Sequence, residues 1–205
     1  MEKFQTEQEA FWAGGFGNDY IERNNNLRIV SGNISLFAHI FKCTRNISSI
    51  IEFGANIGLN LIAIKSLLPN AELSAIEINK KAVKKLSSVE GIKVYNESIL
   101  NFQPDYKRDF AFSKLVLIHI DPDMLQHVYD LLYQTSNKYI CIAEYYNPTP
   151  LSIPYRGHKN RLFKRDFAGE LLDRYTDLKL IDYGFAYRRD NYHEYDDFNW
   201  FLLEK

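Results

Sequence analysis

The stretch that decides the fold is residues 50–58, which read Ile-Ile-Glu-Phe-Gly-Ala-Asn-Ile-Gly. A short apolar run of β type reaches an acidic residue, turns between two glycines and leads into an amphipathic helix at Leu59. Glu77 stands nineteen residues beyond Gly58, at the end of a second strand-like run. A strand, a glycine turn, a helix and a strand with an acidic tip form a βαβ unit of the kind that binds a nucleoside.

Length, charge and cysteine content limit the class of protein. The chain has 205 residues, enough for one domain, and its formal net charge of -1 offers no basic field to nucleic acid. Cys43 and Cys141 form neither a zinc pattern nor a disulfide framework, so we expect reduced thiols in a cytoplasmic protein. The first residues are too polar for a signal peptide, and no apolar stretch approaches the roughly 20 residues that span a bilayer. We therefore expect neither a nucleic-acid partner nor a membrane association.

Hydrophobic periodicity predicts alternating strands and helices from about residue 50 onward. Short apolar runs predict strands at Ile50–Phe53, Glu72–Ile76, Lys93–Tyr95, Phe110–Ile120, Tyr139–Ala143, Leu178–Tyr187 and Asn199–Leu203. Amphipathic segments predict helices at Leu59–Leu68, Lys80–Ser87, Met124–Gln134 and Asp166–Arg174. Because a link of hairpin length joins the last two strands, we expect an α/β fold with a Rossmann-like sheet. That sheet is mostly parallel with one antiparallel strand, and helices cover both faces.

Two regions fall outside this alternation. Residues 1–46 are polar and irregular, with helical patches at 6–12 and 33–41. We expect them to form a cap or lid segment packed on a core of residues 47–205, the whole making a single structural domain. The stretch 144–164 is rich in Pro, Tyr, Asn and Arg and has no clear period, which predicts a long loop. A loop of that length in a compact domain is usually functional or disordered.

The glycine turn discriminates between nucleoside cofactors. A dinucleotide site needs three glycines, but Asn56 and Leu59 occupy the second and third positions, and no Gly-Lys-Ser/Thr follows to make a P-loop. The pattern Glu-x-Gly-x-x-x-Gly from Glu52 to Gly58 instead resembles motif I of the class I S-adenosylmethionine methyltransferases. Their usual central glycine is Asn56 here, and Asn tolerates left-handed backbone angles better than most residues. The resemblance implies the class I methyltransferase fold with S-adenosylmethionine as cofactor.

The expected cofactor contacts follow from this pattern. The turn can approach the methionine part and the ribose of S-adenosylmethionine, and Glu77 can accept hydrogen bonds from both ribose hydroxyls. Ser98 and Ile99, after the third strand, offer adenine a polar group and an apolar wall. The alternatives are that the glycine turn is an ordinary strand–helix connection and that Glu77 is a solvated carboxylate at a strand end. Because turn and carboxylate stand in register, we favour a cofactor site comprising Glu52, Gly54, Asn56, Gly58, Glu77, Ile78, Ser98 and Ile99.

The N-terminal segment carries aromatic and basic residues with no strong reason to be buried. We expect Trp12, Tyr20 and Arg23 to fold over the cofactor, with the Arg23 guanidinium binding the methionine carboxylate. The alternative is a packed extension in which Trp12 and Tyr20 are core anchors. His119 ends the apolar run beside the expected position of the methyl group, although a lone His on an apolar strand is often a satisfied core residue. We predict His119 and Tyr20 as catalytic residues that also contact the cofactor, Asp121 as a helix cap, and no metal site.

The long loop after the fifth strand is the candidate acceptor site, because ligands bind at the carboxyl edge of open α/β sheets. Arg156 and His158 suit an anionic acceptor such as a sugar acid, while the alternative is a surface loop with exposed Tyr and Arg. Residues 192–197 form either a second wall of the acceptor site or a solvated hairpin tip. The predicted acceptor contacts are Tyr145, Tyr146, Asn147, Tyr155, Arg156 and His158.

Three further stretches carry a closer resemblance. Residues 11–24, residues 117–122 and residues 144–167, which include Glu-Tyr-Tyr-Asn-Pro-Thr-Pro and Ile-Pro-Tyr-Arg-Gly-His, are similar to the pseudaminic acid biosynthesis-associated methylases. The resemblance covers nearly the whole chain and implies a place in the metabolism of nonulosonic (sialic-acid-like) sugars or related surface glycans.

The sequence thus favours a methyltransferase acting on a small, anionic acceptor. One alternative is a methyltransferase of another small carboxylate, amine or hydroxyl metabolite. Another is a non-catalytic nucleoside-binding partner in a glycan pathway, since a fold alone does not establish activity. The sequence identifies neither the acceptor nor the methylated atom, nor the need for a base, and it leaves the oligomeric state open.

Overall fold

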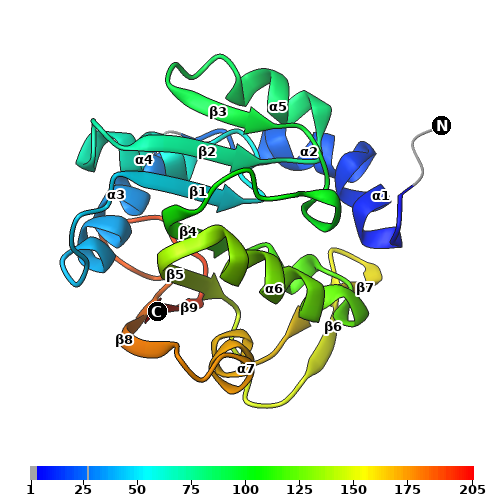
Figure 1. Ribbon diagram of the computed structural model, residues 1–205. Coiled ribbons are helices and arrows are strands. Elements are labelled where there is room, and N and C mark those ends of the chain that lie inside the picture. Colours follow the sequence, from blue (N-terminus) through cyan, green and yellow to red (C-terminus); the bar gives the residue numbers. More distant parts are fainter. Residues whose placement is uncertain (1–3, 27) are drawn as a thin grey trace.

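A seven-stranded sheet organises the molecule, seen in the computed structural model of the chain, which describes residues 4–26 and 28–205. The strand order is β3-β2-β1-β4-β5-β9-β8, and β9 runs antiparallel to both β5 and β8 (Figure 1). This architecture confirms the predicted Rossmann-like sheet. The strands are β1 (Ser49–Phe53), β2 (Glu72–Ile76), β3 (Ile92–Tyr95), β4 (Arg108–Lys114), β5 (Ser136–Glu144), β8 (Lys179–Ala186) and β9 (Phe198–Glu204).

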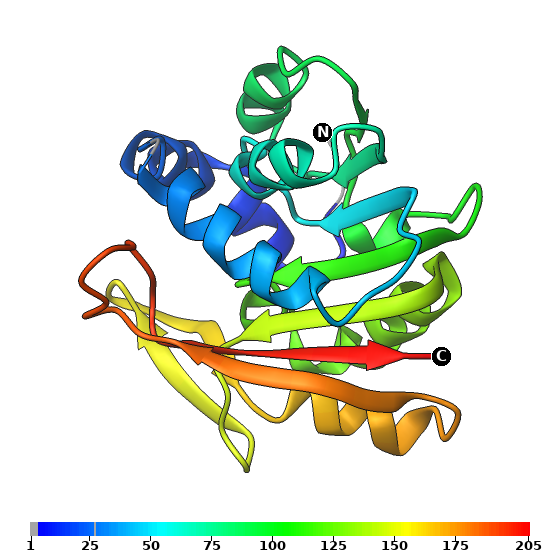
Figure 2. The same ribbon diagram turned by 90° about the vertical axis from the view of Figure 1, so that its left-hand side faces the viewer.

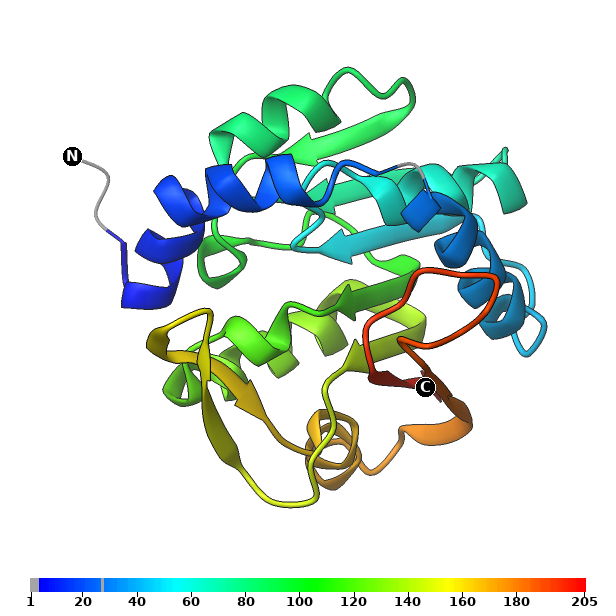
Figure 3. The same ribbon diagram turned by 180° about the vertical axis from the view of Figure 1, so that it is seen from behind.

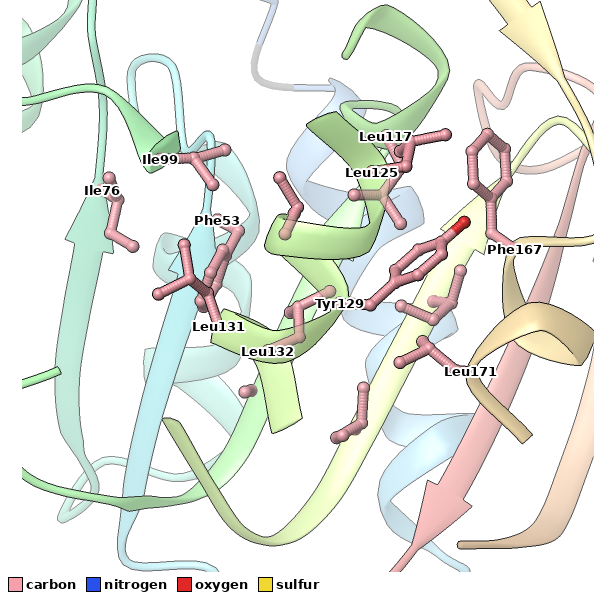
Figure 4. Close-up of a cluster of buried hydrophobic side chains, with 14 of the residues drawn as sticks. Phe53, Ile76, Ile99, Leu117, Leu125, Tyr129, Leu131, Leu132, Phe167 and Leu171 are labelled. Carbon is pink, nitrogen blue, oxygen red and sulfur yellow. The ribbon is translucent and has the colours of Figure 1, made fainter. Parts of the chain in front are cut away.

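Helices cover both faces of the sheet because alternate residues of its central strands are apolar on both sides. Ile51 and Phe53 of β1 belong to the cluster under α6 (Leu125–Thr135) that extends to α7 (Phe167–Arg174), and Figure 4 shows Phe53, Tyr129 and Leu171 of this cluster. Ile50 of the same strand packs on the opposite face, under α3 and α4. Within the described chain no helix is long and apolar enough to cross a membrane. The covering helices are α3 (Arg28–Phe41), α4 (Leu59–Leu67), α5 (Lys80–Leu86), α6 (Leu125–Thr135) and α7 (Phe167–Arg174).

The N-terminal segment is more regular than its composition predicts. Besides α3, it forms α1 (Glu7–Ala13) and α2 (Gly15–Arg23), so the expectation of irregular structure between the two helical patches is wrong. Helix α1 begins with a capping box in which Thr6 and Glu9 satisfy each other's backbone N–H groups. Helix α2 buries only two residues, so its sequence shows little of the apolar stripe that would have revealed it. Residues 1–3 and 27 of the expected cap lie outside the described residues.

The stretch 144–164 is a β-hairpin rather than a structureless loop. Strands β6 (Leu151–Tyr155) and β7 (His158–Lys164) pair antiparallel and form a separate two-stranded sheet (Figure 1). The turn residues Arg156 and Gly157 have φ of 49° and 86°, the left-handed pair that a two-residue hairpin turn needs. The pattern was hidden because Pro154 stands within β6 and the hairpin buries few side chains.

The predicted long strand over residues 110–120 ends at Lys114. Leu115 has a φ of 57°, and a 3-10 helix, η2 (Leu117–His119), follows. The cause lies on β5, where the Glu144 carboxylate accepts hydrogen bonds from the backbone N–H groups of Val116 (3.0 Å) and Leu117 (2.9 Å). These bonds turn the chain across the sheet edge. The predicted cap is confirmed, because the Asp121 side chain accepts a hydrogen bond at the start of a short 3-10 helix, η3 (Pro122–Met124).

Candidate active site

A cavity of about 340 Å³ lies at the carboxyl edge of the sheet. It opens where the strand order reverses between β1 and β4, the usual ligand position in open α/β sheets. Helices α1 and α2 cross this edge, and the loop before β9 lies beside α3 (Figure 3). Figure 2 shows the same loop and the N-terminal helices on one side of the twisted sheet. The predicted site residues that line the cavity are Trp12, Tyr20, Gly54, Asn56, Glu77, Ile78, Ser98, Ile99 and His119.

The glycine turn and Glu77 form one hydrogen-bonded unit. Gly54 and Asn56 have φ of 78° and 49°, so the turn needs left-handed backbone at both positions, and at the second position Asn56 adopts it without being glycine. The Glu77 carboxylate accepts hydrogen bonds from the Asn56 N–H at 2.6 Å and the Asn79 N–H at 2.7 Å. Burial raises the pKa of Glu77, while these two backbone bonds oppose the rise. The carboxylate is thus fixed against the turn and still lines the cavity.

The end of the cavity beyond β3 combines apolar and polar groups. Ile99 is buried and lines it, and the Ser98 hydroxyl donates a hydrogen bond to the Glu9 carboxylate, which ties α1 to the loop after β3. Gln8 also lines this space, and its side-chain oxygen is buried without a hydrogen-bond partner. An apolar wall beside an unused amide oxygen suits a flat heterocycle that carries an amino group.

Aromatic side chains close the middle of the cavity. The Trp12 ring lies 4.6 Å from the His119 ring and 5.2 Å from the Tyr20 ring, centroid to centroid. His119 Nδ1 lies 2.5 Å from the Arg161 carbonyl oxygen and therefore donates to it, which leaves Nε2 as an acceptor. Burial lowers the pKa of His119 to about 4, so the imidazole is neutral at pH 7 and is a weak base. Burial raises the pKa of Tyr20, so its hydroxyl remains protonated.

The far end of the cavity contains a cation that the sequence analysis missed. Lys114 ends β4, and its Nζ lies 5.2 Å from the centroid of the Phe198 ring. Burial lowers the pKa of Lys114, while the neighbouring carboxyl groups of Glu52 and Asp196 oppose the fall. Among the described residues that line the cavity, Lys114 is the only lysine or arginine. The signal was present as a lysine inside an apolar run, but the run was interpreted as one continuous strand.

Three predicted cofactor residues do not line the cavity. Arg23 is exposed, with its guanidinium carbon 5.2 Å from the Phe16 ring centroid, so its side chain stacks outside rather than facing the site. Glu52 lies behind the turn, where its Oε1 accepts a hydrogen bond from Asn60 Nδ2 and burial raises its pKa to about 8. Gly58 is the N-cap of α4, in the left-handed conformation. Glu52 and Gly58 thus shape the turn.

The predicted acceptor residues also lie outside the cavity lining. Tyr155 comes nearest, with its ring 4.8 Å from the His119 ring, and His158 packs 5.0 Å from Phe11. Arg156 is exposed at the hairpin turn, because the positive φ pair turns the chain into solvent there. The remaining three residues lie at the base of the hairpin: Tyr145 beside Lys164, Tyr146 near Phe201, and Asn147 hydrogen-bonded to Thr149.

Part of the segment before β9 lines the cavity, so this segment is not only a solvated hairpin tip. Glu194, Tyr195 and Asp196 line the cavity, and the Tyr195 hydroxyl donates a 2.9 Å hydrogen bond to the Gly32 carbonyl of α3. Asn33, the next residue of α3, also lines the cavity, and its Nδ2 is buried without a partner. No group of three or more His, Cys, Asp or Glu side chains in residues 4–26 and 28–205 could hold a metal ion.

Comparison with solved structures defines the class of fold: that of the class I S-adenosylmethionine-dependent methyltransferases. The plantazolicin methyltransferase BpumL, solved with S-adenosylhomocysteine and a substrate analogue, superposes with a TM-score of 0.67 at 14% identity, over 97% of this chain and 94% of that one. The magnesium protoporphyrin IX methyltransferase of Synechocystis, solved with S-adenosylmethionine, gives 0.66 at 9% identity over 100% of both chains. The 1,6-didemethyltoxoflavin-N1-methyltransferase of Burkholderia thailandensis gives 0.68 at 11% identity, over 97% and 86%. No family model and no curated protein matches the chain.

Proposed function

We propose that the protein is an S-adenosylmethionine-dependent methyltransferase acting on a small, anionic acceptor. The observation that carries this proposal is the Glu77 carboxylate, held on the amides of the glycine turn and facing the cavity. A carboxylate in that position can accept hydrogen bonds from both ribose hydroxyls and repels a phosphorylated nucleotide. The structures with the same fold were solved with S-adenosylmethionine or S-adenosylhomocysteine, which supports the same assignment.

The unused polar atoms of the cavity fit this cofactor. Ile99 and the unpartnered Gln8 oxygen match the face and the amino group of adenine. In the middle of the cavity, the buried Trp12 Nε1 has no acceptor among the described residues, and Trp12 lines the cavity. The methionine part of S-adenosylmethionine carries carboxylate oxygens that such a donor binds. These residues would hold the cofactor, and the bound sulfonium would supply the methyl group.

The residues around the transfer site align and enclose the reactants more than they move protons. Methyl transfer from a sulfonium is an in-line displacement, and alignment can supply about 7–11 kcal/mol of the barrier. Trp12 and Tyr20, from α1 and α2, cover the cavity and exclude water. Because His119 is neutral with a pKa of about 4, it is a poor base. This favours an acceptor atom that already carries a free lone pair, such as a carboxylate oxygen.

The metabolic setting belongs to the same proposal. The likeness of residues 11–24 and 144–167 to the pseudaminic acid-associated methylases supports an acceptor from nonulosonic-acid or surface glycan metabolism. A sugar acid is also compatible with the single lysine of the cavity. The alternatives, another small metabolite as acceptor or a partner that binds the nucleoside without turnover, are outcomes of the experiment below.

Calorimetry with S-adenosylmethionine, followed by detection of S-adenosylhomocysteine in the presence of pseudaminate or N-acetylneuraminate, tests the proposal. We expect cofactor binding and acceptor-dependent product. Absence of cofactor binding would contradict a methyltransferase function on either a glycan-related acceptor or another small metabolite. Binding with turnover on another carboxylate, amine or hydroxyl would move the acceptor outside glycan metabolism, and binding without turnover on any acceptor would favour the non-catalytic partner.

A further inference from the structure

The far end of the cavity holds hydrogen-bond donors that the protein leaves unused. Lys114 Nζ makes no hydrogen bond or ion pair with any described residue, although its side chain is only partly exposed. Asn33 Nδ2, on α3, is buried and equally without a partner. Both residues line the cavity. An unsatisfied buried donor such as Asn33 Nδ2 is costly, and together with an ammonium that has no partner it indicates a ligand that accepts hydrogen bonds.

The direction of the Lys114 side chain separates it from the nucleoside half of the cavity. Phe110, Phe112 and Lys114 point to one face of β4, the face under α3, because alternate residues of a strand share a face. The Lys114 Nζ then lies against Phe198 at the start of β9, on the opposite side of β4 from β1. The glycine turn, Glu77 and Ser98 follow β1, β2 and β3. Lys114 therefore faces the part of the cavity that is left for an acceptor.

The charge of Lys114 has no close counterion in the described part of the chain. The Glu52 carboxyl opposes the fall in the pKa of Lys114 most strongly, but it accepts a hydrogen bond from Asn60, and burial raises its pKa to about 8, so it is protonated and neutral at pH 7. Asp196, which is exposed on the loop before β9, also opposes the fall in the pKa of Lys114. Neither carboxylate lies within ion-pair distance of Nζ. A partly buried ammonium without a close counterion calls for an anion in the same space.

We propose that Lys114 binds a carboxylate of the methyl acceptor, with Asn33 Nδ2 as a second donor. The inference rests on the proposed function and names the substrate class, a monocarboxylate. A single cation in the described lining matches one negative charge, whereas a phosphate with nearly two charges would attract additional basic residues. The competing assignment gives Lys114 to the methionine carboxylate of the cofactor, and the experiment separates the two.

The test compares the full-length wild type with two variants, Lys114→Gln and the control Lys179→Gln on the exposed part of β8. Each protein is saturated with S-adenosylhomocysteine. Each is titrated with acetate, pyruvate and N-acetylneuraminate, and with the corresponding carboxamides. Binding is followed by calorimetry and by the NMR signal of the Lys114 ε-methylene, identified by its loss in Lys114→Gln. We expect at least one carboxylate to shift this signal saturably, its amide to fail, and Lys114→Gln to weaken carboxylate binding about tenfold or more.

Two results would overturn the inference. The first is that no carboxylate shifts the Lys114 signal, or that the amides bind as well as the acids. The second is that Lys114→Gln weakens S-adenosylhomocysteine itself about tenfold or more, which would assign Lys114 to the cofactor. Both results leave the proposed function intact, because wild-type affinity for S-adenosylhomocysteine is measured first. A wild-type protein that does not bind S-adenosylhomocysteine would remove the proposed function and the inference together.

Discussion

Replacing Glu77 by Gln tests whether this carboxylate holds the ribose. The change keeps the shape of the side chain but removes its charge and turns one acceptor oxygen into a donor. In the native protein, the two carboxylate oxygens accept from the Asn56 and Asn79 N–H groups. Each oxygen has a further lone pair, and Glu77 lines the cavity, so both remain available to the ribose hydroxyls.

Glu77→Gln should have two separate effects, one on the free energy of unfolding and one on the affinity for S-adenosylhomocysteine. One backbone N–H loses its acceptor, which lowers the free energy of unfolding by about 1–3 kcal/mol. Loss of a charge-assisted hydrogen bond to the ribose costs about 1.5–3 kcal/mol, so the affinity for S-adenosylhomocysteine should fall about 10- to 150-fold. The two effects are measured separately, because binding is compared only where the variant is folded.

Calorimetry with S-adenosylhomocysteine and urea denaturation give these two quantities. The matched control is Glu72→Gln at the other end of the same strand, where Glu72 is exposed and its carboxylate's only hydrogen bond to a described residue is a long one of 3.4 Å from the Tyr106 hydroxyl. We expect wild-type affinity for the control. A folded Glu77→Gln protein that binds S-adenosylhomocysteine as tightly as the wild type would refute the assignment of Glu77 to the ribose.

Three further predictions concern the turn and the sheet edge. Burial raises the pKa of Glu52 from 4.5 to about 8, so the native state binds the extra proton, and the free energy of unfolding should fall as pH rises between these values. Because the pKa of Glu77 is raised too, Glu52→Gln should reduce that slope in urea titrations without abolishing it, and an unchanged slope would contradict the shift. Glu144→Ala leaves the Val116 N–H and its neighbour without an acceptor and should cost about 2–5 kcal/mol in denaturation, and a loss below about 1 kcal/mol would contradict this role. Gly54→Ala places a Cβ 2.7 Å from a Val116 methyl group, whereas Gly157→Ala meets nothing at a similar φ, so only Gly54→Ala should abolish S-adenosylhomocysteine binding in calorimetry. Equal S-adenosylhomocysteine binding by the two variants would contradict the predicted clash with Val116.

The part of the fold that local sequence determines was predictable. The strands from β1 to β5 are short apolar runs between turns, and the cofactor turn and Glu77 follow from spacing along one βαβ unit. The end of β4 was not predictable, because it depends on Glu144, which follows β4 by about thirty residues in the sequence. Lys114 was therefore hidden inside a longer expected strand.

The far end of the cavity, where we propose that the acceptor binds, shows more strongly how little the sequence alone can predict. Arg156 and His158 have the right chemistry for an anion, but the hairpin turn exposes them outside the cavity. The groups that do line this side, Lys114, Asn33 and Asp196, come from a strand, a helix and a loop that only the tertiary fold brings together. No periodicity or local motif connects them.

A crystal structure of the protein with S-adenosylhomocysteine tests the central claim most directly. We predict adenine against Ile99, both ribose hydroxyls on the Glu77 carboxylate, and the sulfur facing the part of the cavity that Lys114 and His119 line. Adenosine bound elsewhere, or a ribose without contact to Glu77, would contradict the account.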